Sequence, residues 1–333
     1  MDIAQKALYN SLRISWLQDS QISVEPWKVE DYRSLQQDEL FSRLQLRDIF
    51  LDRHAYKSYA EQFDSPEEMT EWLIGGEEHS PEDYDQVYLV IFELWRRLNP
   101  EKPSISILCD ELDLQMFKYD QDQEERKKED LRALQDALSN LHTLLEENVD
   151  QGMAPIEVFS AISEFCANDI EHFLYDYIAD QIDAQDYDYA TELLDEFYPF
   201  VIDKRWFDLL KARLVNIQDL HLANKLIHQV FEANKEDSDP SLALNLDMLS
   251  LMVQGGNYDL FLQIVNHTLT LVEYEEDFIE LLTVCSDFFR CLDQDETQEK
   301  IDALIAKRAH LEKSEPLSKE DPDVRAFKAL LKA

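Results

Sequence analysis

Apolar positions recur at intervals of three and four residues over most of this chain. Such spacing puts apolar side chains on one face of an α-helix. The clearest run lies between residues 168 and 184 and contains Ile170, Phe173, Leu174, Tyr177, Ile178 and Ile182. Segment 104–109 could form a short strand, but it has no obvious strand to pair with, so we interpret it as a helix start or a loop. The pattern predicts an all-α fold, and the low glycine content of 5 residues agrees with it.

Proline and glycine mark where several helices should begin and end. A Ser or Asp that can cap a helix is followed by a Pro, which fits the first turn, at Ser65-Pro66, Ser80-Pro81, Asp239-Pro240 and Asp321-Pro322. Helix ends are expected at Gly75-Gly76, Asn99-Pro100 and Gly255-Gly256.

The segment 119–128 is almost entirely polar. It is the best candidate for a boundary between two parts of the chain, and an exposed loop or the solvated start of a long helix is the alternative. We therefore expect an N-terminal helical bundle over residues 1–120. A polar linker or helix start follows over 121–130, and an α-helical repeat array with a C-terminal helix over 131–333.

The second half contains a degenerate repeat. Three amphipathic helices open near residues 186, 219 and 256. Aligning Ala190 with Ala223 requires a shift of 33 residues, and aligning Ala223 with Phe261 a shift of 38. Each of these helices follows another amphipathic helix, and a fourth pair comes after them. The expected ranges of the preceding helices and the fourth pair are 168–184, 204–216, 240–254, 275–291 and 297–313. Such periods are typical of helical repeat arrays.

This repeat resembles the tetratricopeptide repeat, whose second helix often opens with a Gly-x-Tyr-x-x-Ala-like sequence. Gly-Asn-Tyr-Asp at 256–259 and Tyr-Asp-Tyr-Ala at 187–190 carry the resemblance, which covers about 165–315. Phe261 stands in place of a small residue, Gln185 in place of the turn glycine, and the closing proline is missing. HEAT-like or irregular helix pairs, or a non-repetitive helical domain, are the alternatives. The resemblance implies protein binding on a long inner surface.

Charge is distributed very unevenly along the chain. The 31 Lys and Arg residues stand against 71 Asp and Glu residues, which gives a formal charge of −40. Two stretches contain no Lys or Arg: Ala133–Asp203 has 71 residues with 17 acids, and Glu236–Phe289 has 54 residues with 11 acids. Nothing within these stretches offsets the acids, which repel phosphate backbones and anionic membrane surfaces. We expect a basic protein or peptide segment as partner, with no direct nucleic acid and no membrane.

A stripe of acids runs along the expected helix 168–184, opposite its apolar face. The residues of this stripe are spaced by three and four positions: Asp169, His172, Asp176, Asp180 and Asp183. Tyr175 flanks the stripe. An acidic stripe beside an aromatic ring can hold Lys and Arg side chains by ion pairing and cation–π contact. We interpret these six residues as a partner-binding site, and a merely solvated helix face is the alternative.

The sequence lacks the common catalytic and cofactor-binding motifs. GxGxxG, GxxxxGK[ST], GxSxG and HExxH are all absent. We therefore expect no catalytic residue, no cofactor and no metal. One alternative uses Asp169, His172 and Asp176, which share a helix face, as ligands in a metal-dependent enzyme. The second Glu-x-x-His motif that a carboxylate-bridged di-iron bundle needs is missing.

The expected compartment is the cytoplasm. The four cysteines form no CxxC pair and lie in apolar runs, so buried thiols are expected at Cys109, Cys166, Cys285 and Cys291. No stretch of 18 apolar residues occurs, and the first residues lack a basic segment followed by an apolar run.

These observations predict a non-enzymatic scaffold or chaperone-type adaptor whose acidic helical surface holds a basic segment of a partner protein. The other candidates are the metal-dependent enzyme, an acidic mimic of nucleic acid that occupies the basic groove of a DNA- or RNA-binding protein, and a structural part of a larger assembly.

Overall fold

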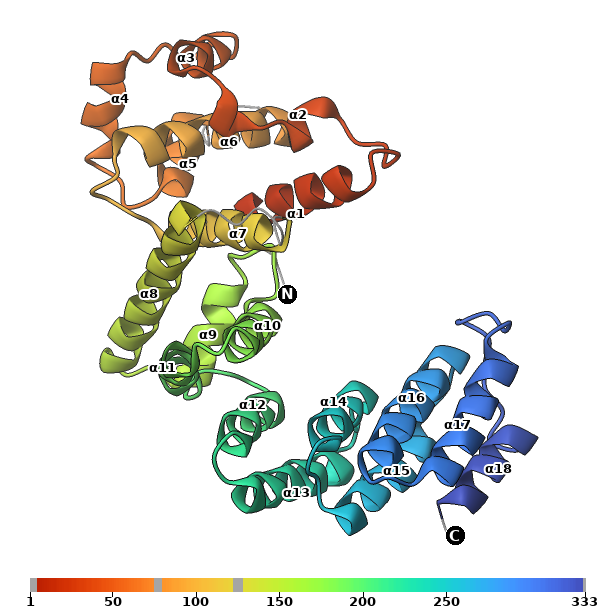
Figure 1. Cartoon of the computed structure of the whole chain (residues 1–333). Helices are drawn as coiled ribbons and strands as arrows, with labels where there is room; N and C mark the ends of the chain where they lie inside the picture. Colours follow the sequence, from red (N-terminus) through yellow and green to blue (C-terminus); the bar gives the residue numbers. More distant parts are fainter. Residues whose placement is uncertain (1–4, 75–79, 122–127, 332–333) are drawn as a thin grey trace. The chain divides into compact units, whose positions relative to one another are not determined.

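The computed structural model describes residues 5–74, 80–121 and 128–331, and over these residues the chain is all-α, as predicted (Figure 1). This part of the chain contains 18 α-helices and a short 3-10 helix but no β-strand; Tyr274 and Pro316 form an isolated bridge. The predicted helix end at Gly75-Gly76 and most of the predicted linker 121–130 lie outside the described residues. Across the described ranges, no helix is both long enough and apolar enough to cross a bilayer.

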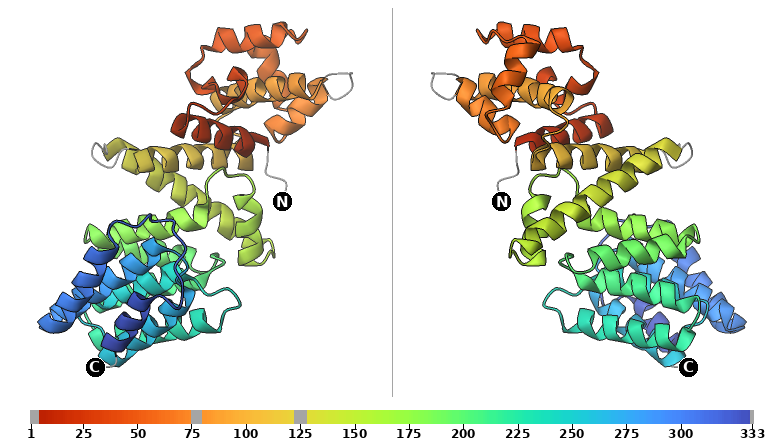
Figure 2. Two further views of the ribbon diagram at one scale, coloured as in Figure 1. Left: turned by 90° about the vertical axis from the view of Figure 1, so that its right-hand side faces the viewer. Right: turned by 90° about the vertical axis from the view of Figure 1, so that its left-hand side faces the viewer.

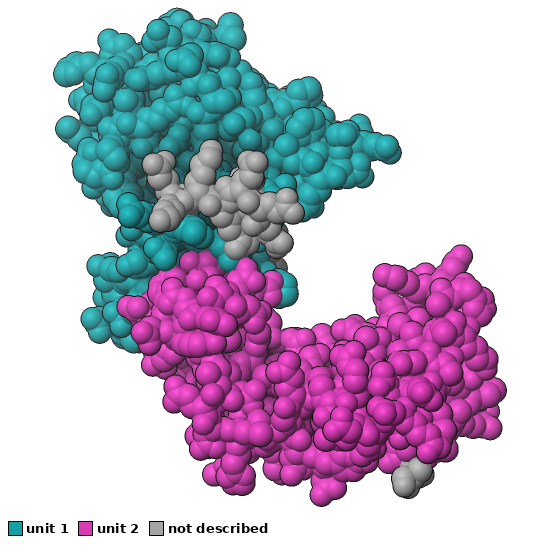
Figure 3. All heavy atoms as spheres, viewed as in Figure 1, with its two compact units in different colours: residues 1–174, 199–201 teal, residues 175–198, 202–333 magenta. Residues whose placement is uncertain are grey.

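The chain divides into two compact units (Figure 3). Unit 1 comprises residues 1–174 and 199–201, and unit 2 comprises 175–198 and 202–333. The predicted domain ranges, 1–120 and 131–333, stay a prediction. The helices of unit 1 are α1 (Gln5–Gln18), α2 (Pro26–Val29), η1 (Tyr32–Ser34), α3 (Gln37–Gln45), α4 (Arg53–Ala60), α5 (Pro66–Ile74), α6 (Pro81–Leu98), α7 (Ile105–Gln121), α8 (Lys128–Asp150) and α9 (Pro155–Ser163).

Helix α10 (Ile170–Asp183) begins in unit 1 and continues into unit 2. The remaining helices belong to unit 2: α11 (Tyr187–Phe197), α12 (Lys204–Asn216), α13 (Leu220–Glu236), α14 (Leu242–Met252), α15 (Tyr258–Leu271), α16 (Glu275–Cys291), α17 (Asp295–Arg308) and α18 (Pro322–Leu330). The ranges of α12 and α16 are those that the sequence predicts, whereas α17 ends five residues earlier than expected.

Most predicted helix boundaries are confirmed. Helices α5, α6 and α18 begin at the predicted prolines, and Ser80 caps α6 by accepting the backbone N–H of Asp83 at 3.1 Å. The start expected at Asp239-Pro240 is wrong, because α14 begins at Leu242 and Ser241 is its cap. Segment 104–109, the one candidate strand, contains the start of α7.

The core of unit 1 is built around α6. Residues Val87–Trp95 of this helix are all buried, and Trp95 is completely inaccessible. Helices α3 and α5 pack against α6, while α1 and α8 pack against α7. A helix that is apolar on nearly every side must be covered by neighbours on every side. The sequence of α6 therefore fixes it as the central element of this unit.

Unit 2 is built from helix pairs. Consecutive helices pack together as α12 with α13, α14 with α15, and α16 with α17. Figure 2 shows the chain from two further sides. Helix α14 also packs against α12 and α16. In Figure 1, α12, α14 and α16 consequently form one layer, and α13 and α15 form a second. The first helix of each pair therefore contributes to a shared surface.

The structure shows the surroundings of three residues of unit 2 that the comparison with the tetratricopeptide pattern singled out: Gln185, Gly256 and Phe261. Gln185, in the turn between α10 and α11, has a φ of 65°, a left-handed conformation that favours glycine. Gly256 stands where the predicted turn requires it, because an added Cβ would collide with Met252. Phe261 of α15 stacks on Phe288 of α16, with 3.6 Å between ring centroids. A large aromatic side chain thus replaces the small residue at this helix contact.

Candidate functional site

The predicted stripe lies on the solvent side of α10 and the residue before it. Tyr175 is half-buried, and the other members are exposed: Asp169, His172, Asp176, Asp180 and Asp183. Asp169 accepts the backbone N–H of His172 at 3.0 Å and caps the helix. Asp183 pairs with Arg213 of α12 at 2.7 Å. No Lys or Arg lies within the acidic stretch, and folding brings Asp183 a cation from outside it.

Tyr175 connects α10 to two other helices of unit 2. Its hydroxyl donates a hydrogen bond to the carboxylate of Asp247 in α14 at 2.8 Å. Its ring meets Trp206 of α12 edge to face, with 5.0 Å between ring centroids. Burial raises the pKa of the Tyr175 phenol, and the nearby carboxylates of Asp247 and Asp176 raise it further.

Two residues of the predicted stripe, Asp169 and His172, belong to unit 1. The site described below therefore contains only residues of unit 2.

Glu280 of α16 extends the acidic surface around Asp247. Partial burial raises the pKa of the Glu280 carboxyl group, and repulsion from Asp247, Asp277 and Glu276 raises it further. Helices α14 and α16 pack against each other, so acids from two helices share one surface. Neither Asp247 nor Glu280 forms an ion pair with any residue that the structure describes.

We call Tyr175, Trp206, Asp247 and Glu280 the acidic–aromatic face. Its residues come from α10 and from α12, α14 and α16, the first helices of the three packed pairs. Sequence reasoning found Tyr175 but missed Asp247 and Glu280. Both residues lie in the second stretch without Lys or Arg, and this could have marked them as candidates for a binding site. Their proximity to Tyr175 could not be predicted, because it depends on how the helix pairs stack.

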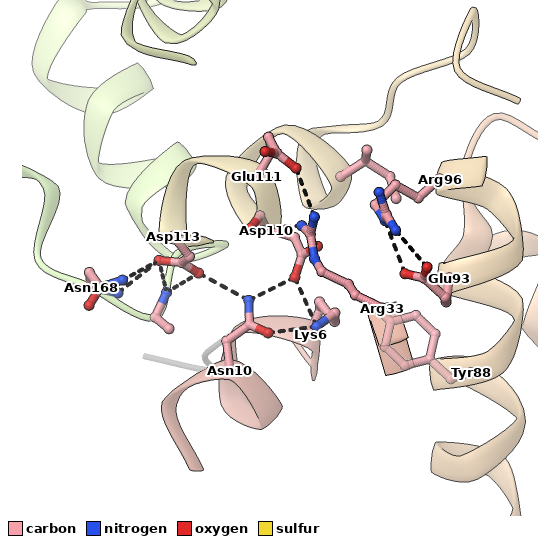
Figure 4. A network of polar contacts seen from close by, with 12 residues as sticks. Lys6, Asn10, Arg33, Tyr88, Glu93, Arg96, Asp110, Glu111, Asp113 and Asn168 are labelled. Carbon is pink, nitrogen blue, oxygen red and sulfur yellow. Dashed lines mark hydrogen bonds and ion pairs between the residues drawn. The ribbon is translucent and has the colours of Figure 1, made fainter. Parts of the chain in front are cut away.

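A different polar cluster is buried in unit 1 and centres on α7 (Figure 4). Asp110, only 4% exposed, pairs with Lys6 at 2.8 Å and with Arg33 at 2.5 Å, and it accepts a hydrogen bond from Asn10 at 3.0 Å. Burial alone would raise the pKa of Asp110, but Lys6 and Arg33 lower it to about 2. The carboxylate therefore stays ionised and ties α1 and the 3-10 helix to α7.

Asp113, one turn further along α7, has neutral donors in place of cations. It accepts the backbone N–H groups of Ala167 and Asn168 at 2.8–3.0 Å and also bonds the side chains of Asn168 and Asn10. Burial raises the pKa of Asp113, and these donors lower it only in part. Sequence reasoning missed this pair of buried acids, because an i, i+3 pair of aspartates on a helix is usually solvated.

The remaining chemistry-bearing residues are dispersed. Within residues 5–74, 80–121 and 128–331, no three His, Cys, Asp or Glu side chains are grouped so that they could hold a metal ion, and this includes Asp169, His172 and Asp176. Cys109, Cys166 and Cys285 are buried as predicted. Cys291 is exposed, which contradicts the prediction, because it lies in the last turn of α16 where the apolar face ends.

Comparisons with known proteins identify no family for this chain. No family model matches the sequence, and neither a curated protein nor a solved structure is similar to it. The site must therefore be judged from its own geometry.

Proposed function

We propose that unit 2 is a protein-binding array whose acidic–aromatic face holds a basic segment of a partner protein, in an adaptor or chaperone-type role without catalysis. One observation carries this proposal: Asp247 and Glu280 repel each other on a shared surface and have no ion-pair partner among the described residues. Such repulsion costs stability unless a cation joins the site. A Lys or Arg side chain of a partner would supply that cation.

The aromatic members of the face support the same proposal. Tyr175 and Trp206 are only partly buried, and they lie on the same surface as Asp247. A cation above an aromatic ring gains about 0.5–2 kcal/mol, depending on how far it is removed from water. Carboxylates can therefore attract a basic side chain and the rings can hold its aliphatic stem and charged end.

We also propose that the helix pairs of unit 2 form an array of the tetratricopeptide kind. The sequences at 187–190 and 256–259 support this finer assignment, together with the packing of consecutive helices as pairs. Stacked repeats of this kind create an extended binding surface. The acidic–aromatic face likewise spans four helices, α10, α12, α14 and α16.

The test is a binding titration of the full chain with fluorescent peptides. One peptide is rich in Lys and Arg with a few Leu residues, and its control has every cation replaced by Gln. We expect the basic peptide alone to bind, with affinity that falls at least tenfold between about 50 and 300 mM NaCl. Equal binding of both peptides, or an affinity that salt leaves unchanged, would overturn the proposal.

A pair of double variants locates the binding surface. Asp247→Asn with Glu280→Gln removes two charges from the acidic–aromatic face, and we expect it to weaken peptide binding about tenfold. Asp188→Asn with Asp195→Asn removes two charges from exposed positions of α11 and should change affinity less than twofold. Equal losses in both variants would mean that only the net charge of the chain attracts the peptide.

A further inference from the structure

Unit 1 contains a cleft that the proposed function does not use. It lies between α1 and the segment 28–33, and side chains of α6 and α7 form its floor. Its enclosed volume is about 70 Å³, and the open space in and above it is about 700 Å³. Four cations line it, although the chain as a whole carries a charge of −40: Lys6, Arg13, Lys28 and Arg33. Charges more than about 8 Å away are largely screened at physiological salt, so the charges of the lining itself matter most. The lining also contains five acids, Glu30, Asp31, Glu93, Asp110 and Asp113, and what each cation and acid is paired with therefore decides which ligand can bind.

The four cations differ in how firmly they are held. Lys6 and Arg33 are fixed by the buried carboxylate of Asp110 (Figure 4). Arg13 contacts Asp31 at 3.3 Å, and Lys28 contacts Glu25, whose side chain is 60% exposed. Exposed ion pairs of this type contribute about 0–1 kcal/mol. An incoming anion can therefore replace the partners of Arg13 and Lys28 at small cost.

Two acids of the lining are paired with arginines that lie outside the lining. Arg43 binds Glu30 with two hydrogen bonds of 2.6 and 2.8 Å from outside the cleft. Glu93 is 2% exposed and is held by Arg96 and Arg97. Two further acids of the lining, Asp31 and Asp113, differ from these: Asp31 pairs with Arg13 itself, and Asp113 has only neutral N–H donors. An anion in the cleft would therefore have to draw Arg13 away from Asp31, and it would meet two cations that can exchange partners.

The rest of the lining is apolar. Ile14 and Leu17 of α1 face the cleft, as do Leu114 and Phe117 of α7. Sites for small molecules combine an apolar wall with a few polar groups that fix orientation. Here the polar groups are cations and carboxylates, and the apolar side chains form the wall that the aliphatic chain or ring of a ligand would contact.

We propose that this cleft binds a small organic anion, with its carboxylate or phosphate between Arg13 and Lys28 and its apolar body against Ile14, Leu17, Leu114 and Phe117. The proposal is independent of the function assigned to unit 2. Both anionic head groups present the oxygen acceptors that Arg and Lys recognise, and the test separates them.

Three probes with the same ring are titrated into the folded full chain and followed by calorimetry: 2-naphthoate, 2-naphthyl phosphate and 2-naphthylmethylamine. We expect one or both anions to bind with a Kd below about 1 mM and at least tenfold more tightly than the amine. The stronger of the two anions identifies the head group. If neither anion binds more tightly than the amine, the proposal is wrong, whatever the variants show.

Matched variants then place the ligand. Arg13→Gln with Lys28→Gln removes the exchangeable cations but leaves the buried cluster around Asp110 intact, and we expect it to weaken anion binding about tenfold. Arg53→Gln with Lys57→Gln removes an Arg and a Lys from exposed positions of α4 in the same unit. The control should bind as the parent chain does. Equal weakening by the two double variants, or none by the first, would overturn the assignment to this cleft.

Discussion

Asp110 and Asp113 lie one helical turn apart on α7, and folding shifts the pKa values of their carboxyl groups in opposite directions. Both are buried, which raises a carboxyl pKa. The pKa of Asp110 falls to about 2 because Lys6 and Arg33 lie within 2.8 Å, whereas Asp113 has only neutral donors, and its pKa is raised. At the scale of single residues, the nature of the neighbours outweighs the degree of burial.

Replacing Asp110 tests this account. We expect Asp110→Asn to lower the free energy of unfolding at pH 7 by about 3 kcal/mol, because Lys6 and Arg33 lose their buried partner. The carboxyl pKa falls on folding from 3.8 to about 2, so its contribution is complete above pH 3.8 and disappears as the pH falls through 2. Urea unfolding at several pH values measures the difference from the parent chain.

That difference should shrink below pH 3.8, in the range where the parent chain is still folded. Asp136→Asn, at an exposed position of α8, serves as the control and should change stability by less than about 0.5 kcal/mol. A loss at Asp110 that stays constant with pH would contradict an electrostatic origin.

Gln185 offers a change in the stabilising direction. Its φ of 65° is unfavourable for a residue with a Cβ, and glycine adopts this conformation without strain. Relief of the left-handed strain is worth about 1–2 kcal/mol, and the greater freedom of glycine in the unfolded chain offsets about 0.4–1 kcal/mol of it, so we expect Gln185→Gly to raise the free energy of unfolding by about 0.5–1 kcal/mol, as the midpoint of urea unfolding would show. Gln181→Gly, within the regular part of α10, should lower it by about 1 kcal/mol. Stabilisation by both changes, or by neither, would contradict the explanation.

At the scale of helices, the residues that precede equivalent helices of the repeat differ in whether their side chains cap the helix. Asp186 and Asp219 precede α11 and α13 and are 33 residues apart, the shift of the repeat itself. The carboxylate of Asp219 accepts the backbone N–H of Leu222 at 2.9 Å, whereas Asp186 makes no such side-chain bond. The two helices therefore begin with the same residue type but not with the same stabilising contact.

Alanine substitutions compare the two caps directly. We expect Asp219→Ala to lower the free energy of unfolding by about 1 kcal/mol, because an N–H group at the start of α13 loses its acceptor. Asp186→Ala should have an effect below about 0.5 kcal/mol. Chemical unfolding of both variants measures the difference, and equal effects would show that the cap bond contributes nothing specific.

The sequence predicts the elements of this fold better than their contacts. Apolar spacing located α12 and α16 to the residue, since each buries one continuous face. The spacing alone could not show that Phe261 stacks on Phe288, or that Asp247 meets Tyr175, because these contacts depend on how far each helix pair is displaced along the next. The acidic stretches were visible from the start, but which acids share a surface was not.

At the scale of the whole chain, the net charge of −40 is the dominant feature. Several cations of unit 2 are engaged inside it, including Arg213 with Asp183, and Arg308, which is 4% exposed, with Glu275 and Asp321. Arg308 thereby offsets one acid of α16, whereas Asp247 of α14 and Glu280 of α16 form no ion pair with a described residue. The folded chain should consequently be stabilised by any ion that screens repulsion.

Thermal unfolding in NaCl tests this expectation. We expect the midpoint to rise by several degrees between about 20 and 300 mM NaCl, because screening weakens repulsion among the acids more than it weakens the buried pairs. KCl should give the same rise, since screening depends on ionic strength and not on which monovalent cation is present. A midpoint that falls with salt would mean that attractive surface ion pairs outweigh the repulsion.

Cys291 is exposed and therefore offers a site at which the chain can be labelled with a fluorescent dye. The other three thiols are buried. A hydrogen bond with Cys109 raises the pKa of the Cys166 thiol, burial raises it further, and burial raises the pKa of Cys285, so the reactive thiolate is suppressed at both. A maleimide dye should thus attach at a single position without any engineering. That position lies on the same helix as Glu280, about 16 Å along its axis, close enough for a fluorophore there to sense a peptide arriving on α16.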